Sequence, residues 1–219
     1  MIKTRGLCVR FGDGTGIRYS DLTFEAGQSY ALLGASGCGK STLLNLLAGI
    51  LTPSEGTVEI DGEDTSRRTQ KQRDAFRIHR IGFIFQDFKL LEDMTVADNI
   101  NLLRLEGVDT SGMDALLDRL GILPLKRRKV RRLSGGEKQR VAIARALIKQ
   151  PSIILADEPT GNLNYEYGVK IVEQLIENAG SGTLITVTHD DRLAPRFDHV
   201  LDMSAVARFD AGKGGGTNV

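Results

Sequence analysis

Gly34-Ala35-Ser36-Gly37-Cys38-Gly39-Lys40-Ser41 fits the pattern G-x-x-x-x-G-K-[ST] of a phosphate-binding loop. The apolar run Tyr30–Leu33 precedes it and the apolar helical pattern Thr42–Ala48 follows it, which predicts a strand, a loop and a helix in that order. The glycines let successive backbone N–H groups turn inward toward phosphate oxygens, and the helix adds its N-terminal partial positive charge. We therefore predict that this loop binds the phosphates of a nucleotide.

Two side chains of the loop have distinct predicted roles. Lys40 supplies positive charge to the outer phosphates during catalysis, and the Ser41 hydroxyl is placed to coordinate Mg²⁺. We interpret Cys38 as a small residue at a position where the backbone amide makes the contact. The residues expected to bind the nucleotide here are Gly34, Ala35, Ser36, Gly37, Cys38, Gly39, Lys40, Ser41 and Thr42.

Short apolar runs alternate with helical patterns along the chain, which predicts an α/β fold with a mostly parallel sheet. These runs are mainly apolar and do not alternate, as expected of parallel strands that are buried on both faces. The expected strands are Ser29–Leu33, Ile81–Phe85, Ile153–Ala156 and Leu184–Thr188.

Other segments alternate between apolar and polar residues, and they predict a small antiparallel sheet beside the parallel one. These segments are Leu7–Phe11, Leu22–Glu25 and Thr57–Asp61.

The stretch from 87 to 149 has a helical pattern, clearest at Ala115–Leu120 and Glu137–Ile148. Because it is short and flanked by core strands, we interpret it as a helical insertion into one domain. We expect this single P-loop NTPase domain to cover residues 1–210, with a disordered tail at 211–219.

The composition is that of a soluble globular chain: of 219 residues, 41% are hydrophobic and 26% are charged. A net charge of +1 gives no electrostatic reason to expect nucleic acid as a partner. We interpret the basic runs Arg67–Arg80 and Lys126–Arg132 as solvated helix faces and loops. Two cysteines give no disulfide framework, and no apolar run is long enough to span a bilayer. We therefore expect a cytoplasmic protein, whose membrane role would require another polypeptide.

Two carboxylates follow the apolar strand Ile153–Ala156 directly. Ligands of open α/β sheets bind at the carboxyl ends of the strands, so these acids should face the same crevice as Lys40. Asp157 fits the role of a Mg²⁺ ligand, and Glu158 fits a general base that polarises the attacking water.

Two further polar residues follow predicted strands in the same way. His189 comes after Leu184–Thr188, where an imidazole can bond a γ-phosphate and position the water. Gln86 ends Ile81–Phe85, where an amide can reach both Mg²⁺ and the water. Taken alone, His189 would be interpreted as a structural histidine and Gln86 as a loop amide. Their placement parallel to Asp157 favours a catalytic role.

A second glycine-rich turn, Ser134-Gly135-Gly136, opens the predicted helix Glu137–Ile148. Free N–H groups and the helix dipole make such a turn a second place for an anion. Two phosphate half-sites far apart in one small domain are best explained by two copies of the chain that enclose two nucleotides between them.

Together these motifs closely resemble the nucleotide-binding subunits of ATP-binding-cassette transporters, from about Ile2 to Met203. The resemblance implies ATP hydrolysis, a homodimer, and an integral membrane transporter subunit that holds the cassette at the inner face of the membrane. It implies that Phe11 stacks on adenine, the alternative being a core phenylalanine at a strand end. It also implies that Ser134, Gly135 and Gly136 bind the γ-phosphate held by the opposite subunit.

The finer resemblance is to the branch that serves lipoprotein release, macrolide or peptide export, and cell division. It rests on Phe85–Leu91, Thr95–Asn99 and Leu155–Leu163. Two features depart from the family. Asn164 replaces the usual Asp of a loop at the dimer interface, which is expected to weaken hydrolysis or communication between sites. Met203–Ala207 lacks the usual glycine-containing turn that leads to a final strand.

Three alternative functions fit parts of this pattern. A cassette ATPase acting on DNA or ribosomes would typically carry a long coiled-coil insertion or a second cassette, and this chain shows neither. An ATPase that signals to a membrane partner without transport fits the cell-division-like stretch near Gln86. The third alternative, a nucleotide-binding module that hydrolyses ATP slowly, is suggested by Asn164.

Overall fold

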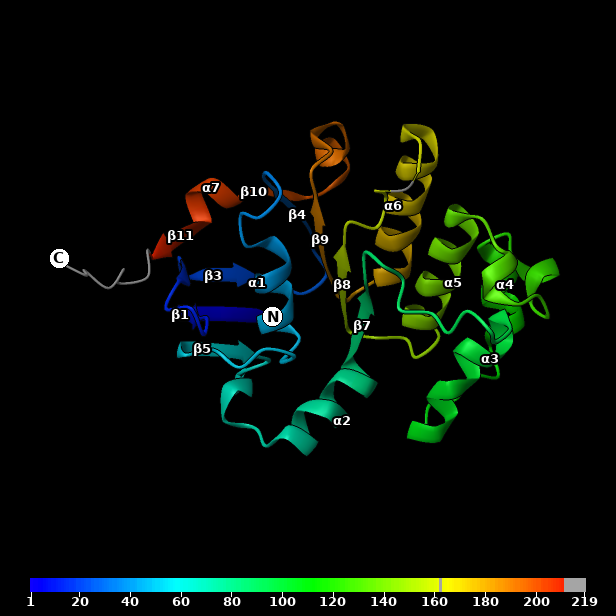
Figure 1. The fold of residues 1–219 in the computed structure, drawn as a ribbon, viewed down its shortest axis with the longest axis horizontal. Coiled ribbons are helices and arrows are strands. Elements are labelled where there is room, and N and C mark those ends of the chain that lie inside the picture. Colours follow the sequence, from blue (N-terminus) through cyan, green and yellow to red (C-terminus); the bar gives the residue numbers. More distant parts are fainter. Residues whose placement is uncertain (162, 211–219) are drawn as a thin grey trace, which may run out of the picture.

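The computed structural model describes residues 1–161 and 163–210. A parallel sheet runs through its centre, with the strand order β10-β4-β9-β8-β7 (Figure 1). All of its neighbouring strands pair in parallel, so their carboxyl ends share one edge. The four predicted strands are confirmed, and β10 is an addition. The strands are β4 (Ser29–Leu33), β7 (Ile81–Ile84), β8 (Ile153–Asp157), β9 (Thr183–Thr188) and β10 (His199–Asp202).

An antiparallel sheet with the order β11-β2-β1-β5-β6 lies beside it, and β3 pairs with β1. The three predicted segments are confirmed as β1, β3 and β5, whereas β2, β6 and β11 had no clear alternating signal. A final strand, β11, forms after the short helix α7 although the glycine-containing turn is missing. The strands are β1 (Ile2–Arg10), β2 (Gly16–Tyr19), β3 (Leu22–Phe24), β5 (Glu55–Ile60), β6 (Glu63–Asp64) and β11 (Ala207–Asp210).

The helices α3 to α6 lie on one side of the parallel sheet, and α1 lies on the other with the antiparallel sheet (Figure 1). The helices α4 and α5 confirm the two helical patterns predicted at Ala115–Leu120 and Glu137–Ile148, whereas α6 had no predicted counterpart. The basic run that contains α2 is a solvated helix, because none of the residues of α2 is buried. The helices are α1 (Lys40–Leu47), α2 (Gln70–Arg80), α3 (Val96–Asn101), α4 (Met113–Arg119), α5 (Gly135–Leu147), α6 (Tyr165–Ala179) and α7 (Met203–Val206), with 3-10 turns at Thr65–Arg67, Leu102–Glu106, Leu123–Leu125, Val130–Arg132 and Asp191–Arg196.

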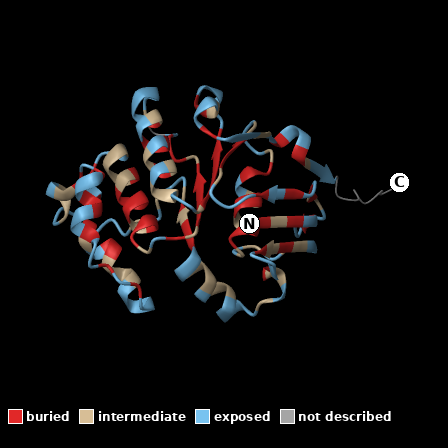
Figure 2. Ribbon diagram, turned by 180° about the vertical axis from the view of Figure 1, so that it is seen from behind, coloured by how far each residue is buried: buried red, intermediate tan, exposed pale blue. Residues whose placement is uncertain are grey.

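Two apolar cores enclose the parallel sheet, one on each face (Figure 2). Alternate residues of β8 divide between them. Ile154 and Ala156 pack in the core formed with the helical side, and Ile153 and Leu155 pack in the core formed with α1 and the antiparallel sheet. All four side chains are buried, which explains why this strand is apolar throughout.

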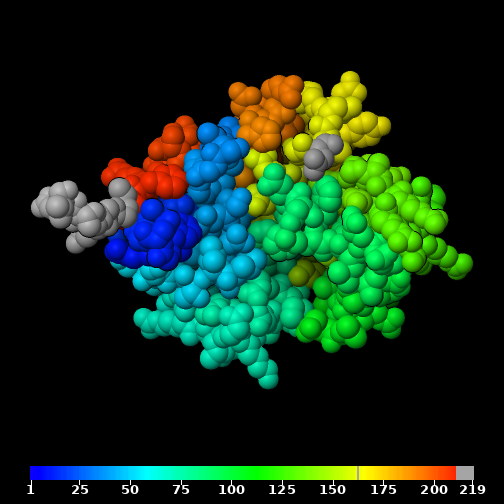
Figure 3. All heavy atoms as spheres, viewed as in Figure 1, coloured from blue at the N-terminus to red at the C-terminus, as the bar shows by residue number. Residues whose placement is uncertain are grey.

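A groove of about 380 Å³ opens between α2 and the segment of α3. Figure 3 shows this hollow between the teal and green parts of the surface. Its walls are mainly apolar, and the rings of Phe83 and Phe85 stack there with their centroids 4.2 Å apart. Basic side chains, among them Arg77, Arg145 and Lys149, also line it.

Two predictions concern the extent of the domain. The assignment of residues 1–210 to one domain, with a helical subdomain at about 87–149, stays a prediction. The predicted tail, 211–219, lies outside the described residues. Within the described part of the chain, no helix has the length and apolar character needed to cross a membrane.

Gly56 allows a close approach between β1 and β5, and replacing it by alanine tests this packing. Its φ is +83°, and an added Cβ would lie 2.4 Å from the carbonyl oxygens of Arg5 and Gly6. We expect Gly56→Ala to lower the free energy of unfolding by roughly 3 kcal/mol, because backbone strain and overpacking add. Gly62→Ala is the control, since Gly62 has a φ of +85° but no atom within 4 Å of the added Cβ. Its expected cost is about 1 kcal/mol, measured by denaturant unfolding, and equal costs for both variants would contradict the contact.

Candidate functional site

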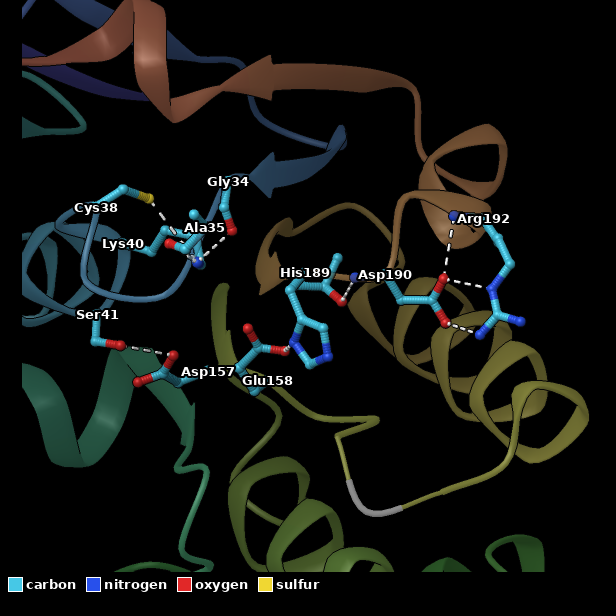
Figure 4. A network of polar contacts seen from close by, with 11 residues as sticks. Gly34, Ala35, Cys38, Lys40, Ser41, Asp157, Glu158, His189, Asp190 and Arg192 are labelled. Carbon is cyan, nitrogen blue, oxygen red and sulfur yellow. Dashed lines mark hydrogen bonds and ion pairs between the residues drawn. The ribbon is translucent and has the colours of Figure 1, made fainter.

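Four predicted site segments meet at the carboxyl edge of the parallel sheet. The phosphate-binding loop follows β4, the acidic pair ends β8, His189 follows β9, and Gln86 follows β7. Figure 4 shows the first three of these segments converging from their separate strands. The parallel pairing of the strands is the reason for this convergence.

The backbone of the phosphate-binding loop requires glycine at two positions. Gly39, with a φ of +91°, is the N-cap of α1, and no side chain caps this helix. At Gly34 an added Cβ would lie 2.7 Å from Sγ of Cys38 and 3.1 Å from Cβ of Met203. The first N–H groups of α1 are therefore not engaged by a capping side chain, as anion binding requires.

Lys40 turns its side chain back over this loop and is only 6% exposed. Its Nζ donates hydrogen bonds to the carbonyl oxygens of Gly34 (2.7 Å) and Ala35 (2.9 Å). Figure 4 shows the ammonium group held inside the curve of the loop. A cation fixed at this point strengthens the attraction of the loop for phosphate.

Asp157 and Ser41 bring two oxygen ligands together. The Ser41 hydroxyl donates to Oδ1 of Asp157 at 2.9 Å. Burial raises the pKa of the Asp157 carboxyl above its usual value and the charge of Glu158 adds to this, while the hydrogen bond from Ser41 opposes it. In the described part of the chain no group of three or more His, Cys, Asp and Glu side chains could hold a metal. One carboxylate and one hydroxyl nevertheless suit Mg²⁺, which takes its remaining oxygens from phosphate and water.

Glu158 and His189 form the second pair of the site. Nδ1 of His189 lies 2.8 Å from Oε2 of Glu158, and the carboxylate side chain is 11% exposed against 62% for the imidazole. An ionised carboxylate only accepts, so Nδ1 carries the proton in this contact. The φ of Glu158 is +49°, a strained value for a residue with a side chain. Such strain is common at functional positions, and here it turns the carboxylate toward the histidine.

Gln86 is exposed in the turn that follows β7. Its neighbour Asp87 lies close enough for its charge to contribute to the raised pKa of Asp157. The turn therefore reaches the acidic strand end, although no hydrogen bond of the described residues joins Gln86 to it.

Phe11 lies in the turn between β1 and β2, where its N–H donates to the Thr15 carbonyl at 2.8 Å. Its side chain is 41% exposed. The alternative of a core phenylalanine is therefore wrong. An exposed ring is free to stack on a base, and that role stays a prediction.

The second glycine-rich turn begins α5 as expected. The Ser134 Oγ accepts from the N–H of Glu137 and the Glu137 carboxylate accepts from the N–H of Ser134, which is a capping box. Ser134 and Gly135 are exposed, and an added Cβ on Gly136 would lie 3.0 Å from Cδ2 of Leu163. The start of α5 lies at the upper right of Figure 1 and the phosphate-binding loop at the upper left. The glycine-rich turn and the phosphate-binding loop thus lie on the same side of the molecule but well apart from each other.

Asn164, the departure from the family pattern, is the N-cap of α6. Its Oδ1 accepts a hydrogen bond from the N–H of Tyr167 at 3.0 Å. Asparagine and aspartate cap helices about equally well, so the replacement keeps the local structure and removes one charge.

Two supporting residues were missed in the sequence. The hydroxyl of Tyr19 donates to the Gly39 carbonyl at 2.8 Å, and Met203 packs against Gly34. Tyr19 lies on β2, and Met203 begins α7, elements that carry little pattern of their own. The sequence therefore gave no signal for either contact.

The central parallel sheet and its phosphate-binding loop define a P-loop nucleotide-binding protein. A family model described as "ABC transporter" matches residues 17–161. The chain belongs to the ABC transporter family, which confirms the resemblance seen in the sequence.

Characterised and uncharacterised relatives agree with this assignment. The lipoprotein-releasing system ATP-binding protein LolD of Legionella pneumophila is 38% identical over 92% of this chain and 93% of its own. An uncharacterized ABC transporter ATP-binding protein of Mycobacterium tuberculosis is 43% identical over 82% of this chain and 75% of its own. The macrolide export ATP-binding/permease protein MacB of Agrobacterium fabrum is 39% identical over 93% of this chain, which spans 33% of MacB.

Solved structures give the same fold. The dimeric structure of MJ0796, a bacterial ABC transporter cassette, has a TM-score of 0.81 and 33% identity, covering 98% of this chain and all of that one. A post-hydrolysis state of MJ0796 bound to ADP and Pi has a TM-score of 0.82 and 32% identity, over 98% and 100%. The chain is an ATP-binding subunit of an ABC transporter and an ATPase. These relatives do not favour the alternative of signalling without transport.

Asp157→Asn tests the cost of the buried carboxylate. Because burial and the charge of Glu158 raise its pKa, the ionised side chain opposes folding at neutral pH, and the amide removes that charge with little change of shape. We expect a higher Tm for the variant without nucleotide or Mg²⁺, together with a loss of ATP turnover. Asp118→Asn, on the exposed side of α4, is the control. An unchanged or lower Tm for Asp157→Asn by calorimetry would contradict the assignment.

Proposed function

We propose that two copies of this chain each bind Mg-ATP and then close face to face, so that each copy completes the other's site. One observation carries this proposal. Lys40, Asp157 and Glu158 converge at one sheet edge, while the second anion-binding turn at Ser134 is exposed elsewhere on the same side. The turn therefore meets a triphosphate only if another copy presents one. The dimeric MJ0796 structure supports this arrangement.

Within each site the side chains have separate roles. Phe11 stacks on the adenine, the phosphate-binding loop and Lys40 hold the phosphates, and Ser41, Asp157 and Gln86 are the Mg²⁺ ligands. When bound, Mg²⁺ neutralises charge on the phosphate oxygens. Binding at these positions depends on oxygen ligands that the fold has already brought to 2.9 Å of each other.

Hydrolysis depends on Glu158 and His189. Glu158 accepts a proton from the attacking water, and His189 orients the carboxylate through the contact of 2.8 Å. Gln86 holds the water from the neighbouring strand. Positioning of this kind, with electrostatic stabilisation by Lys40, supplies most of the catalysis of phosphoryl transfer.

The dimer drives a separate integral membrane subunit at the inner face of the membrane. The apolar groove between α2 and α3 supports this, because it borders the segment after β7 that contains Gln86. An apolar segment of the membrane subunit docked there would sense the position of that segment. The similarity to LolD and MacB favours export or the handling of lipoproteins or peptides.

Glu158→Gln tests the assigned base. The amide keeps the shape of the side chain but accepts no proton, so we expect ATP binding to persist and turnover to fall by about 10²–10⁴-fold. ATP should then trap a dimer, visible by size-exclusion chromatography with light scattering. Glu177→Gln, an exposed position of α6, is the matched control. Rapid turnover by Glu158→Gln would refute the role of Glu158.

Gly135→Asp, added to Glu158→Gln, tests the composite site. Aspartate is favourable at the first position of a helix, so α5 should fold normally. Its carboxylate would face the triphosphate of the other copy, and we expect the ATP-trapped dimer to be lost while each monomer still binds ATP. An intact dimer in this double variant would rule out the arrangement.

A further inference from the structure

The segment between β7 and α3 is held by a guanidinium group from α5. Arg145 donates from one terminal nitrogen to the Phe88 carbonyl at 2.8 Å and from the other to the Lys89 carbonyl. Two parallel donors of a planar guanidinium fix both the position and the orientation of the peptide they bind. The bound residues come two and three positions after Gln86.

The peptide that Arg145 binds is in an unfavourable conformation. Phe88 has a φ of +62° and Lys89 a φ of +47°, so two consecutive residues with side chains are left-handed. Such residues persist only where surrounding contacts determine them. The turn's own contacts are the bonds from the N–H of Phe88 to the Phe85 carbonyl and from the N–H of Lys89 to the Asp87 carbonyl, with an exposed ion pair between the Lys89 and Asp87 side chains. Arg145 adds bonds from outside the turn to the carbonyls of both left-handed residues.

Arg145 depends on these carbonyls in turn. Burial lowers the pKa of its guanidinium, and among the described residues it has no carboxylate partner. Lys149 is a nearby charge of the same sign, because the charge of Arg145 adds to the effect of burial in lowering the pKa of Lys149. A partly buried cation of this kind needs acceptors, and the strained turn supplies them.

A second side chain fixes the far end of the same segment. Asn99, which is fully buried on α3, accepts from the N–H of Leu91 at 2.8 Å and donates to the Leu91 carbonyl at 3.0 Å. The segment after Gln86 is thus bound to two helices of the helical side, whereas Gln86 itself follows a strand of the sheet.

We propose that Arg145 is a positioning residue for Gln86: by holding Phe88 and Lys89 in their left-handed conformation, it sets where the Gln86 amide stands relative to Asp157 and Glu158. This rests on the proposed role of Gln86 in hydrolysis. Because Ser134 is the N-cap of α5, the same helix that follows the second anion-binding turn also holds the segment of Gln86.

The first experiment compares Arg145→Ala, Arg145→Lys and Lys149→Gln in the full chain. Lys149 also lines the groove at the end of α5 but donates to the Arg77 carbonyl and not to the turn. We expect Arg145→Ala to lower kcat about tenfold or more with little change in KM for ATP, because it removes two charged hydrogen bonds without touching the nucleotide. Arg145→Lys should recover only part of the loss. Lys149→Gln is the control and should keep the wild-type kcat. Wild-type kcat for Arg145→Ala would overturn the proposal.

Hydrogen exchange separates a local effect from misfolding. In Arg145→Ala we expect faster exchange for the peptide that covers residues 85–91 and unchanged exchange for β8 and β9. Unchanged exchange at 85–91 would overturn the proposal. A second variant tests the strain itself, because glycine accepts a φ of +47° without cost. Adding Lys89→Gly to Arg145→Ala should restore part of kcat, and no recovery would count against the proposal.

Gln86→Ala, measured in parallel, distinguishes this inference from the proposed function. If Gln86→Ala keeps the wild-type kcat, the role of Gln86 in hydrolysis is wrong whatever the exchange data show. If Gln86→Ala is slow and Arg145→Ala is not, the positioning role of Arg145 is wrong and the proposed function stands. Slow turnover in both, with no further loss in the double variant, would support the inference.

Discussion

Burial of the parallel sheet on both faces is the constraint on which the rest of this structure depends. A strand such as β8, with alternate residues in two apolar cores, has no room for polar side chains along its length. Charged side chains are therefore confined to the strand ends, and parallel pairing gathers those ends on one edge. The chemistry of the protein is concentrated there because the remainder of the sheet excludes it.

The two carboxylates at the end of β8 illustrate how position alone separates their proposed roles. Asp157 is still within the strand, is buried and accepts a hydrogen bond from a hydroxyl. Glu158 is the first residue beyond the strand and turns toward an exposed imidazole through a left-handed backbone. Adjacent residues of the same charge thus enter different environments, one suited to a cation and the other to proton transfer.

The sequence was sufficient for the central strands, the phosphate-binding loop and the acidic strand end, since each has a continuous apolar run or a fixed motif. It was insufficient for β2, β11 and the role of Tyr19, because these short elements are defined by their partners in the sheet and carry no periodicity. The hydrogen bonds of Arg145 could not be predicted either, because they join residues that are 56 and 57 positions apart in the sequence. Only the folded chain shows that α5, the helix that follows the second glycine-rich turn, holds the segment of Gln86.

Met203 connects the segment after β10 to the phosphate-binding loop, a contact that no sequence pattern predicts. Its side chain forms one wall behind Gly34, while β11 joins the antiparallel sheet through β2, the strand of Tyr19. The phosphate-binding loop is thus contacted by Tyr19, which precedes it in the sequence, and by Met203, which follows it. This loop consequently reaches its final shape only when residues from β2 and α7, far from it in the sequence on either side, have packed against it.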